Sequence, residues 1–420
     1  MSKKNLEQWL SFLESNHPTE IDMGLDRVRT VAQRLDLIKP TPITVLVAGT
    51  NGKGSTVTIT SSVLQQAGLS VGSYMSPHLH RYNERVSING VCVSDEEIIE
   101  SFEAIDKARA EISLTYFEFG TLSALYIFKK HYLDACVLEI GLGGRLDAVN
   151  IVEADGAAVT SIGLDHQDWL GSDIAQIAYE KAGVYRTQKP AICGQRNVPE
   201  SLPKHAKSIN APLYLKGVDF DYVQNPQSWS WKGKNSSGET IELNDLALPS
   251  LPIENAATAI QLLIQIKPDL TYEQINAGIE SAYLPGRLQT FDFPFKGMID
   301  VGHNPQAASL LNAELSKCDT SGKTIGLLAM LADKDAASVV AEMTEVEEWV
   351  ICGISGYRGQ TAQELLSKLM LDECQVTTFD AIDNGLDYLA QNTQSSDQVV
   401  IFGSFVTAAQ AQSWLAEQPR

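Results

Sequence analysis

The stretch Ile43-Thr-Val-Leu-Val-Ala-Gly-Thr-Asn-Gly-Lys-Gly-Ser-Thr56 is the part of the chain that best predicts its fold. Its apolar half, which includes Ile43 and Val45, predicts a buried β-strand. The glycine-rich segment Gly49–Thr56 follows at once, and a helical pattern then runs on to Gly68, where a helix is expected to end. A strand, a glycine-rich turn and a helix N-terminus form a setting for a bound phosphate, because backbone N–H groups and the helix dipole meet there.

This segment departs from the usual P-loop pattern at one position. The pattern places Ser or Thr directly after the lysine, whereas Gly54 separates Lys53 from Ser55 and Thr56. A glycine-rich turn that carries a solvated lysine is therefore the alternative to a phosphate site.

Length and charge limit the remaining possibilities. A chain of 420 residues is long for one hydrophobic core, so two domains are expected. The formal net charge of −20 argues against general binding to nucleic acid or to an anionic membrane, since long-range repulsion opposes both. It does not exclude a small polyanion, provided that lysines and arginines converge in one cleft.

Cysteine usage and the N-terminal sequence predict a cytoplasmic protein. The six cysteines are scattered without a C-x-x-C pair, which is typical of a reducing compartment. The first residues have no long apolar core and no cleavage site of a signal peptide, and no apolar run is long enough to span a bilayer. No coiled-coil pattern is present, so a monomer is expected.

The order of strand and helix patterns predicts an α/β fold. A mainly parallel, P-loop-type sheet is expected in the first part, with a small antiparallel β region at 210–250, and a smaller Rossmann-like α/β domain at the C-terminus. Pro and Gly interrupt the segment Leu284–Leu288, and the domain boundary is expected near residues 285–296. The predicted organisation is a first domain at 1–286, a linker at 287–296 and a second domain at 297–420.

Polar residues follow several of the predicted strands. Ser76, Glu139 and Asp165-His166 all lie at such ends, where parallel sheets bind their ligands. A carboxylate and an imidazole beside a phosphate loop suggest a Mg²⁺ shell, since Mg²⁺ prefers oxygen ligands and shares substrate phosphates. Two alternatives stay open: Glu139 forms an ion pair with a neighbour such as Arg145, and His166 makes a loop hydrogen bond.

Three further segments carry candidate residues. Gly141–Asp147 is a second glycine-rich turn, which either admits a ligand or simply turns the chain. Lys181 lies on a predicted helix near its end, where it is either functional or a solvated lysine that compensates the helix dipole. After a later strand, Asp300 could accept from a ribose or adenine and His303 could contact a phosphate, with Arg287 nearby; this cluster is expected to close on the first one.

Together, and in this order, these segments resemble the folylpolyglutamate synthase/dihydrofolate synthase family, within the wider group of Mur-type ATP-dependent amide ligases. The resemblance extends over nearly the whole chain, and the glycine after the phosphate-loop lysine is what this family shows. The segments that carry it are Gly49–Thr56, Ser76–His78, Tyr116–Gly120, Leu138–Asn150, Ser161–Gly171, Glu180–Gly183, Leu284–Arg287 and Asp300–Pro305.

The resemblance implies an ATP- and Mg²⁺-dependent ligase that joins L-glutamate to dihydropteroate and further glutamates to reduced folates. The folate carboxylate would attack the γ-phosphate of ATP to form an acyl phosphate, and the amino group of glutamate would then displace phosphate. The protein would mainly position these groups and neutralise charge.

The resemblance also implies roles for individual residues. ATP would be held by Asn51, Gly52, Lys53, Gly54, Ser55, Thr56, Asn255, Arg287 and Asp300. Mg²⁺ would be bound by Ser76, Glu139 and His166, and a carbamylated Lys181 would bind a second Mg²⁺. The pterin and dihydropteroate pocket would be formed by Asp22, Met23, Gly24, Leu25, Thr115, Tyr116, Phe117, Glu118, Leu146, Asp147 and Ala148, and Ser404 would help to bind glutamate. The residues expected to act in catalysis are Lys53, Lys181 and His303.

Two other functions remain open at this point. One is a Mur-type ligase that acts on a cell-wall nucleotide precursor; the segments Asp22–Arg27 and Phe117–Phe119 favour a pterin instead. The other is a nucleotide-binding regulatory or scaffold protein that hydrolyses ATP slowly, against which two motif clusters, one in each domain, argue.

Overall fold

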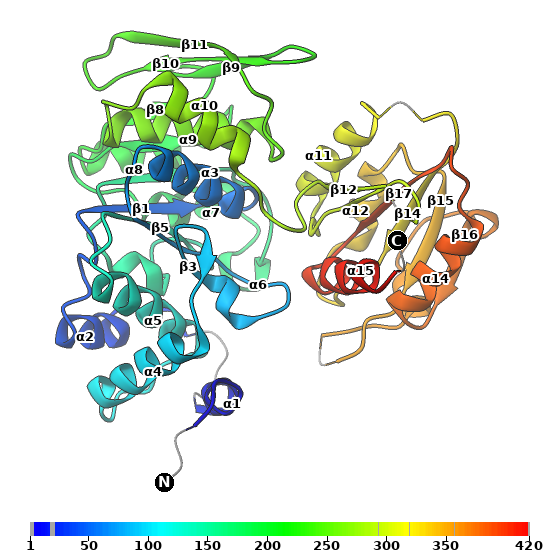
Figure 1. Ribbon diagram of the computed structural model, residues 1–420, viewed down its shortest axis with the longest axis horizontal. Helices are drawn as coiled ribbons and strands as arrows, with labels where there is room; N and C mark the ends of the chain where they lie inside the picture. Colours follow the sequence, from blue (N-terminus) through cyan, green and yellow to red (C-terminus); the bar gives the residue numbers. More distant parts are fainter. Residues whose placement is uncertain (1–3, 17–21, 293, 319, 357, 419–420) are drawn as a thin grey trace. The chain divides into compact units, whose positions relative to one another are not determined.

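A computed structural model describes residues 4–16, 22–292, 294–318, 320–356 and 358–418. The chain divides into two compact units, Met1–Tyr283 and Leu284–Arg420, and each is built around its own sheet with helices on it (Figure 1). The predicted α/β fold class is therefore confirmed. The predicted linker at 287–296 contains strand β12 (Gln289–Phe291), whose antiparallel pairing with β13 (Gly297–Ile299) makes it part of the second unit.

The sheet of the first unit has eight strands in the order β4-β3-β2-β5-β1-β6-β7-β8. The phosphate-loop strand β1 lies inside this sheet, where it pairs in parallel with β5 and β6. Only β3 and β4 run antiparallel to their neighbours among the described strands of this sheet. The strand bounds are β1 Ile43–Ala48, β2 Val71–Tyr74, β3 Val86–Ile88, β4 Val91–Cys92, β5 Ala135–Glu139, β6 Gly156–Val159, β7 Ala191–Cys193 and β8 Leu213–Leu215.

Helices cover both faces of this sheet. On one side α3 packs against α9 and α10, and on the other α5 packs with α1, α2 and α4 (Figure 1). The helix bounds are α1 Leu6–Asn16, α2 Asp26–Arg34, α3 Lys53–Gln66, α4 Asp95–Arg109, α5 Tyr116–Lys130, α6 Gln167–Leu170, α7 Ile174–Ala182, α8 Ser201–Ser208, α9 Ile253–Ile266 and α10 Tyr272–Ser281, with short 3₁₀ helices η1 Tyr82–Arg85 and η2 Ala148–Ile151.

The predicted antiparallel region exists but is smaller than 210–250. Strands β9 (Asp221–Gln224), β10 (Trp229–Lys234) and β11 (Thr240–Leu246) form a three-stranded antiparallel sheet. The preceding strand β8 pairs in parallel with β7 and so belongs to the large sheet. The indole N–H of Trp231 donates to the carbonyl oxygen of Ala257 at 3.1 Å, which attaches the small sheet to α9.

The second unit contains a six-stranded sheet in the order β12-β13-β17-β14-β15-β16. All described neighbours are parallel except β12 and β13, in agreement with the predicted alternation of strands and helices. Helix α11 packs beside α12, and α14 beside α15. The remaining bounds are β14 Thr324–Leu328, β15 Glu348–Cys352, β16 Val376–Phe379, β17 Gln398–Phe402, α11 Pro305–Leu315, α12 Ala336–Glu342, α13 Ala362–Leu366, η3 Glu373–Gln375, α14 Ile382–Asn392 and α15 Phe405–Glu417.

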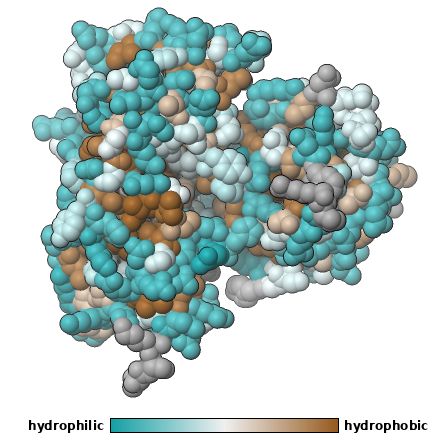
Figure 2. Space-filling model, in the orientation of Figure 1, coloured by the Kyte–Doolittle hydropathy of each residue, from teal (hydrophilic) through white to brown (hydrophobic). Residues whose placement is uncertain are grey.

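The visible surface is mainly hydrophilic. Figure 2 shows hydrophilic residues over most of both units, with hydrophobic residues gathered mainly about the middle of the first unit. This agrees with a chain in which 20% of the residues are charged. Among the residues that the structure describes, no helix has the length and apolar character needed to cross a membrane.

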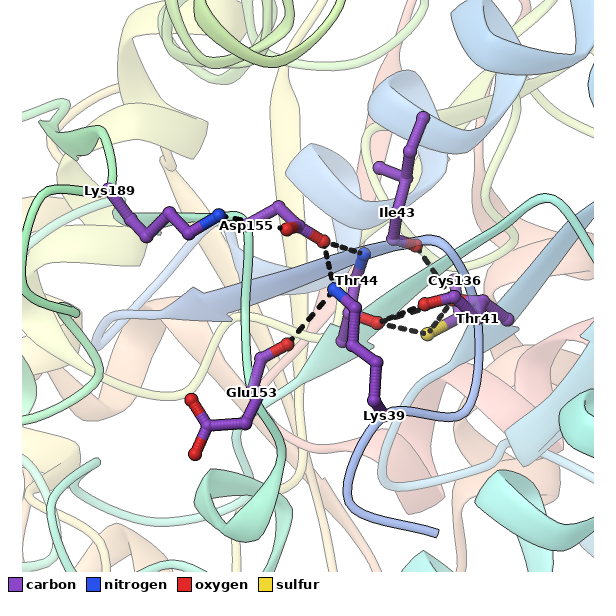
Figure 3. A network of polar contacts seen from close by, with 8 residues as sticks. All are labelled: Lys39, Thr41, Ile43, Thr44, Cys136, Glu153, Asp155 and Lys189. Carbon is purple, nitrogen blue, oxygen red and sulfur yellow. Dashed lines mark hydrogen bonds and ion pairs between the residues drawn. The ribbon is translucent and has the colours of Figure 1, made fainter.

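A polar network ties the amino ends of β1 and β6 together (Figure 3). Asp155, directly before β6, accepts from the backbone N–H of Thr44 in β1 at 2.8 Å. The same carboxylate forms ion pairs with Lys39 and, at 3.2 Å, with Lys189. Burial works to raise the pKa of Asp155, but the hydrogen bonds from Lys39 and Thr44 outweigh it and hold this pKa below its usual range. The ionised carboxylate therefore stabilises the β1–β6 pair.

The substitution Asp155→Asn is expected to lower the free energy of unfolding of the first unit by about 1–2 kcal/mol at pH 7, since it removes charge-assisted hydrogen bonds. Because the pKa of Asp155 is depressed in the folded state, its contribution is present above the pKa of the unfolded chain and is lost as pH falls through the folded-state value. Amide hydrogen exchange in peptides that span β1 and β6 measures the effect.

The matched control for this experiment is Asp36→Asn. Asp36 also pairs with a lysine, Lys129, but its side chain is 91% exposed, so the ion pair is expected to contribute little. Equal exchange rates in both variants at pH 7 would show that Asp155 does not hold these strands together.

Candidate active site

The glycine-rich loop after β1 is held against the segment that follows β6. The backbone N–H of Thr50 donates to the carbonyl oxygen of Ser161 at 2.9 Å, and the N–H of Asn51 donates to Ser161 Oγ at 2.9 Å. Gly49 makes this approach possible, because a Cβ atom there would lie 1.9 Å from Thr160 Oγ1. The loop is therefore shaped by contacts with residues more than 100 positions away in the sequence.

Asn255, a predicted ATP ligand, lies directly against this loop. Gly52 has φ of +83° and forms the N-cap of α3, and a Cβ atom there would lie 2.3 Å from Asn255 Oδ1. Helix α3 begins at Lys53, and the hydroxyl of Thr56 donates to the carbonyl oxygen of Gly52 at 2.9 Å. Gly54, Ser55 and Thr56 form the buried first turn of α3. The structure thus brings Asn255 to the predicted phosphate-binding residues.

Lys53 and Glu139 face each other beside the loop. The Nζ atom of Lys53 lies 3.9 Å from Glu139 Oε1 and donates to the carbonyl oxygen of Thr50 at 3.2 Å. The backbone N–H of Ser76 donates to Glu139 Oε2 at 3.2 Å. The alternative of an ion pair between Glu139 and a neighbour is confirmed, but the partner is Lys53 and not Arg145, whose Nη2 atom lies 2.9 Å from Glu180 Oε1. With its side chain 18% exposed, Lys53 is also not the solvated lysine of the alternative interpretation.

The predicted metal ligands suit a divalent ion that is shared with a phosphate. Glu139 offers a carboxylate that is 7% exposed, next to Ser76, and Ser76 and His166 line one cavity. Within the described parts of the chain, no three side chains of His, Cys, Asp or Glu gather closely enough to hold a metal by themselves. A hydroxyl, a carboxylate and an imidazole leave coordination positions for phosphate oxygens and water, as Mg²⁺ requires.

Lys181 is buried and therefore is not the solvated lysine that the sequence left as an alternative. The residue is 3% exposed near the end of α7. Burial lowers the pKa of Lys181 to about 7, and the positive charge of Lys53 adds to this effect while Asp165 opposes it. A large fraction of this amine is therefore neutral near pH 7 and is able to act as a nucleophile or as an acceptor of protons.

The second glycine-rich turn packs tightly against this lysine. A Cβ atom on Gly144 would lie 2.6 Å from the carbonyl oxygen of Glu180 and 3.0 Å from the Cα atom of Lys181. Arg145, the next residue, forms its ion pair with Glu180 at 2.9 Å. The turn therefore does more than reverse the chain, because it holds the end of α7.

A cavity of about 790 Å³ lies at the carboxyl edge of the sheet. Apart from Leu25 and Ser404, all the predicted substrate-binding residues line it, together with Ser76 and His166. Leu25 instead occupies the N-cap position of α2, and the helix begins at Asp26, so that the segment before it is free to form part of the wall. Gly141 lines the cavity and lets the ring of Phe117 approach, since a Cβ atom there would lie 2.4 Å from Phe117 Cζ.

Sequence patterns do not identify two arginines, of which one lines this cavity and the other contacts residues of its wall. Arg85 lines it, stacks over Tyr82 and Tyr116 at 5.5 Å from each ring centre, and donates from Nε to His78 Nδ1 at 2.9 Å. Arg27 forms ion pairs with two cavity residues. The sequence indicates Arg27 only as the end of the segment Asp22–Arg27, and no local pattern around Arg85 predicts that it faces the cavity.

Asp147 is a buried carboxyl group in the cavity wall. It accepts from the backbone N–H groups of Leu142 and Val149, each at 2.8 Å. Burial raises the pKa of Asp147 to about 7, although these hydrogen bonds and the charge of Lys53 oppose the shift. The group therefore titrates near neutral pH, as acid and base groups of active sites often do.

In the second unit, Asp300 and His303 follow β13, Ser404 follows β17, and Arg287 lies before β12. Asp300 is buried and accepts from the backbone N–H groups of Leu288 at 3.0 Å and Gly302 at 2.6 Å. Burial raises the pKa of Asp300, and the charge of Arg287 opposes this. Arg287 and His303 both lie near the ring of Phe405. The Cζ atom of Arg287 lies 5.0 Å from the centre of this ring, and the centre of the His303 ring lies 6.5 Å from it. These residues therefore form one cluster.

Ser404 caps the helix that begins at Phe405. It is the N-cap of α15, accepts from the backbone N–H of Thr407 at 3.0 Å, and is 3% exposed. Its predicted contact with glutamate stays a prediction, because the described contacts are those of a helix cap.

Comparisons with known proteins give one consistent result. Residues 286–405 match the family described as Mur ligase, glutamate ligase domain. The chain is 42% identical to the dihydrofolate synthase/folylpolyglutamate synthase of Escherichia coli over 96% of this chain and 94% of the relative, and 39% identical to that of Haemophilus influenzae over 96% of each.

Solved structures agree with this result. The Escherichia coli FolC protein in complex with DHPP and ADP is 42% identical, with a TM-score of 0.94 over 98% of each chain. The bifunctional folylpolyglutamate synthase/dihydrofolate synthase of Yersinia pestis, complexed with AMPPNP and a Mn ion, is 43% identical, with a TM-score of 0.93 over 98% of each chain. The folylpolyglutamate synthase of Mycobacterium tuberculosis complexed with ADP is 26% identical, with a TM-score of 0.87 over 99% of each chain.

The substitution Gly52→Ala is expected to weaken ADP binding by roughly tenfold or more, since displacing a positioned group by about 1 Å can cost on the order of 100-fold. The added methyl group would collide with Asn255 and strain a left-handed backbone. Isothermal titration calorimetry with ADP measures the loss.

Gly68→Ala is the matched control. Gly68 has φ of +81°, so the backbone strain is similar, but no atom lies within 4 Å of its Cβ position. It is expected to cost about 1 kcal/mol of stability and leave ADP affinity unchanged. Equal ADP affinities in the two variants would contradict a phosphate-binding role for the loop.

Proposed function

The chain belongs to the dihydrofolate synthase/folylpolyglutamate synthase family, and we propose that it uses ATP to join L-glutamate to dihydropteroate and further glutamates to reduced folates. One observation carries the proposal: the same cavity of about 790 Å³ is lined by the predicted pterin segments Asp22–Gly24 and Thr115–Glu118 and by Ser76 and His166. A single cavity would thus hold both the heterocycle of a folate precursor, among the pterin segments, and its carboxylate, close to the predicted metal ligands. This arrangement supports the activation of a carboxylate by ATP.

The first half-reaction needs two anions to approach each other. The carboxylate oxygen of the folate precursor attacks the γ-phosphorus, the bond to the β–γ bridging oxygen breaks, and ADP leaves. Lys53, whose Nζ atom lies beside Glu139, would neutralise phosphate charge together with the N–H groups at the start of α3. Mg²⁺ held by Ser76, Glu139 and His166 would offset charge on the phosphates when bound.

In the second half-reaction the amino group of glutamate attacks the acyl carbon, phosphate leaves and the amine loses a proton. Enclosure of the acyl phosphate protects it from water. We infer that Asp300, Arg287 and His303 of the second unit contribute to nucleotide binding and to this step. Their support is the cluster that Arg287 and His303 form around Phe405, next to the buried carboxylate of Asp300.

We further infer that Lys181 is carbamylated in the active enzyme. Its neutral amine would attack CO₂ and lose a proton, and the resulting carbamate would offer a carboxylate able to bind a second Mg²⁺. The burial of Lys181 and its pKa of about 7 support this chemistry, because only the neutral amine reacts.

The central prediction concerns ATP turnover with dihydropteroate, glutamate, both or neither. We expect ADP and a new amide only when both substrates are present. The carboxylate of dihydropteroate is needed to accept the phosphate, and the amino group of glutamate is needed to form the amide. Coupled ADP release and mass spectrometry of the product measure the two outcomes. ATP hydrolysis that ignores both substrates would support the regulatory alternative instead.

The variant Lys181→Ala is expected to lose activity by on the order of 100-fold, the usual cost of removing one group that stabilises charge. Added formate or acetate should restore part of it by supplying a carboxylate. Above pH 7 the wild-type amine becomes more neutral, so a ¹³C carbamate signal from labelled bicarbonate should strengthen as pH rises from 6 to 8.

Lys189→Ala, in which an exposed lysine is removed, should retain full activity. The carbamate is ruled out if short carboxylates restore nothing and wild-type protein gives no ¹³C signal.

A further inference from the structure

Arg27 joins two segments that line the cavity but are 91 positions apart in the sequence. Its Nη1 atom lies 2.7 Å from Asp22 Oδ2, and its Nη2 atom donates to the carbonyl oxygen of Asp22 at 3.1 Å. The same Nη2 atom donates to Glu118 Oε1 at 3.0 Å. One guanidinium therefore connects the segment before α2 with the first turn of α5.

The contact with Glu118 extends to the backbone of α5. Glu118 Oε2 accepts from the backbone N–H of Thr115 at 2.8 Å, and Thr115 Oγ1 accepts from the N–H of Glu118 at 3.1 Å. These two bonds form a capping box, so the side chain of Glu118 is fixed relative to the start of the helix. A movement of Arg27 would thus be transmitted to Thr115–Glu118, which form part of the cavity wall.

The ion pairs of Arg27 differ in their exposure. The side chain of Glu118 is 4% exposed, whereas those of Arg27 and Asp22 are 29% and 38% exposed. A buried carboxylate needs a partner, and arginine supplies several donors in a rigid, planar group that one ammonium cannot reproduce. Among the described residues that line the cavity, Asp22 and Glu118 are present and Arg27 is not. Arg27 therefore acts on the cavity through its two partners.

We propose that Arg27 is a positioning residue that fixes the distance between Asp22–Gly24 and Thr115–Glu118 and thereby determines affinity for the pterin end of the folate substrate. The inference rests on the proposed function, which assigns the pterin to this part of the cavity. A flat, rigid heterocycle gains binding energy only from walls held at the correct separation. ATP and glutamate do not depend on this separation, so their binding is unaffected by Arg27.

The test compares steady-state kinetics of the full-length wild type with Arg27→Ala and Arg27→Lys. In Arg27→Ala, KM for dihydropteroate should rise roughly 10- to 100-fold, the range for losing hydrogen bonds between charged groups. Its KM values for ATP and glutamate should stay within about twofold of wild type, because a substitution usually has little effect on a site with which it shares no contact. Arg27→Lys should fall between the two proteins, since lysine keeps the charge but cannot pair with both carboxylates at once.

Arg29→Ala is the matched control on the same helix. It removes an arginine two positions away whose side chain does not line the cavity as described, and it should leave all three KM values unchanged. Thermal melting and ADP titration on each variant separate a local effect from general loss of structure. If Arg27→Ala does not fold, the KM of Arg27→Lys for dihydropteroate is compared with that of the wild type instead.

A second measurement examines the link to Glu118. In an Arg27→Ala/Glu118→Gln double variant, the fold-loss of dihydropteroate affinity should be at least about fivefold smaller than the product of the fold-losses in the two single variants. The reason is that both substitutions remove the same contact between Arg27 and Glu118. Multiplicative losses would overturn the proposed connection.

The outcomes separate this inference from the proposed function. If the wild type binds dihydropteroate in a fluorescence titration and Arg27→Ala binds it equally well, the positioning role is overturned while the function stands. A parallel rise of all three KM values in a variant with a lowered melting temperature also overturns it, because the role is then one of stability. If the wild type neither binds nor uses dihydropteroate, the proposed function itself fails.

Discussion

The rest of the first unit depends on the contact between the glycine-rich loop and the chain that surrounds it. The loop leaves β1 in the middle of the large sheet, and Gly49 and Gly52 let Thr160 and Asn255 come closer than any side chain at these positions would permit. Backbone N–H groups at the start of α3 are thereby held in place before a ligand arrives. Such preorganisation would favour the phosphate binding that we propose for this loop, because a site that must first rearrange loses binding energy to its own ordering.

Around this loop the fold keeps several ionisable groups away from water. Removing an ion from water costs several kcal/mol, so these groups shift toward their neutral forms unless they have partners. Lys181 and Asp147 show the shift, since burial brings the pKa of each to about 7. The carboxylate of Glu139 instead has partners, namely the Nζ atom of Lys53 and the backbone N–H of Ser76. Buried ionisable groups lower the free energy of unfolding, and they are typical of sites where charge develops during a reaction.

Local patterns predicted much of this molecule. The strand, loop and helix at residues 43–66 were predicted because their hydrophobic periods and glycines act over a few residues. The alternation that defines the second unit was predicted for the same reason. The sequence predicts a linker where β12 lies, and this is wrong because the three residues of β12 have no pattern of their own and their structure comes from pairing with β13. The roles of Lys181 and of the pterin segments came from the family resemblance, not from any local pattern.

The sequence patterns therefore determined the fold class and the strand, glycine-rich loop and helix at residues 43–66, and the resemblance to a known family added most of the residues that line the cavity. Only the tertiary structure decided that Arg145 pairs with Glu180, that Lys181 is buried, and that Arg27 connects Asp22 with Glu118. The physical reason is the range of the interactions concerned. Secondary structure and loop chemistry depend on neighbours along the chain, whereas burial and ion pairing depend on which distant segments the packed sheet and helices bring together.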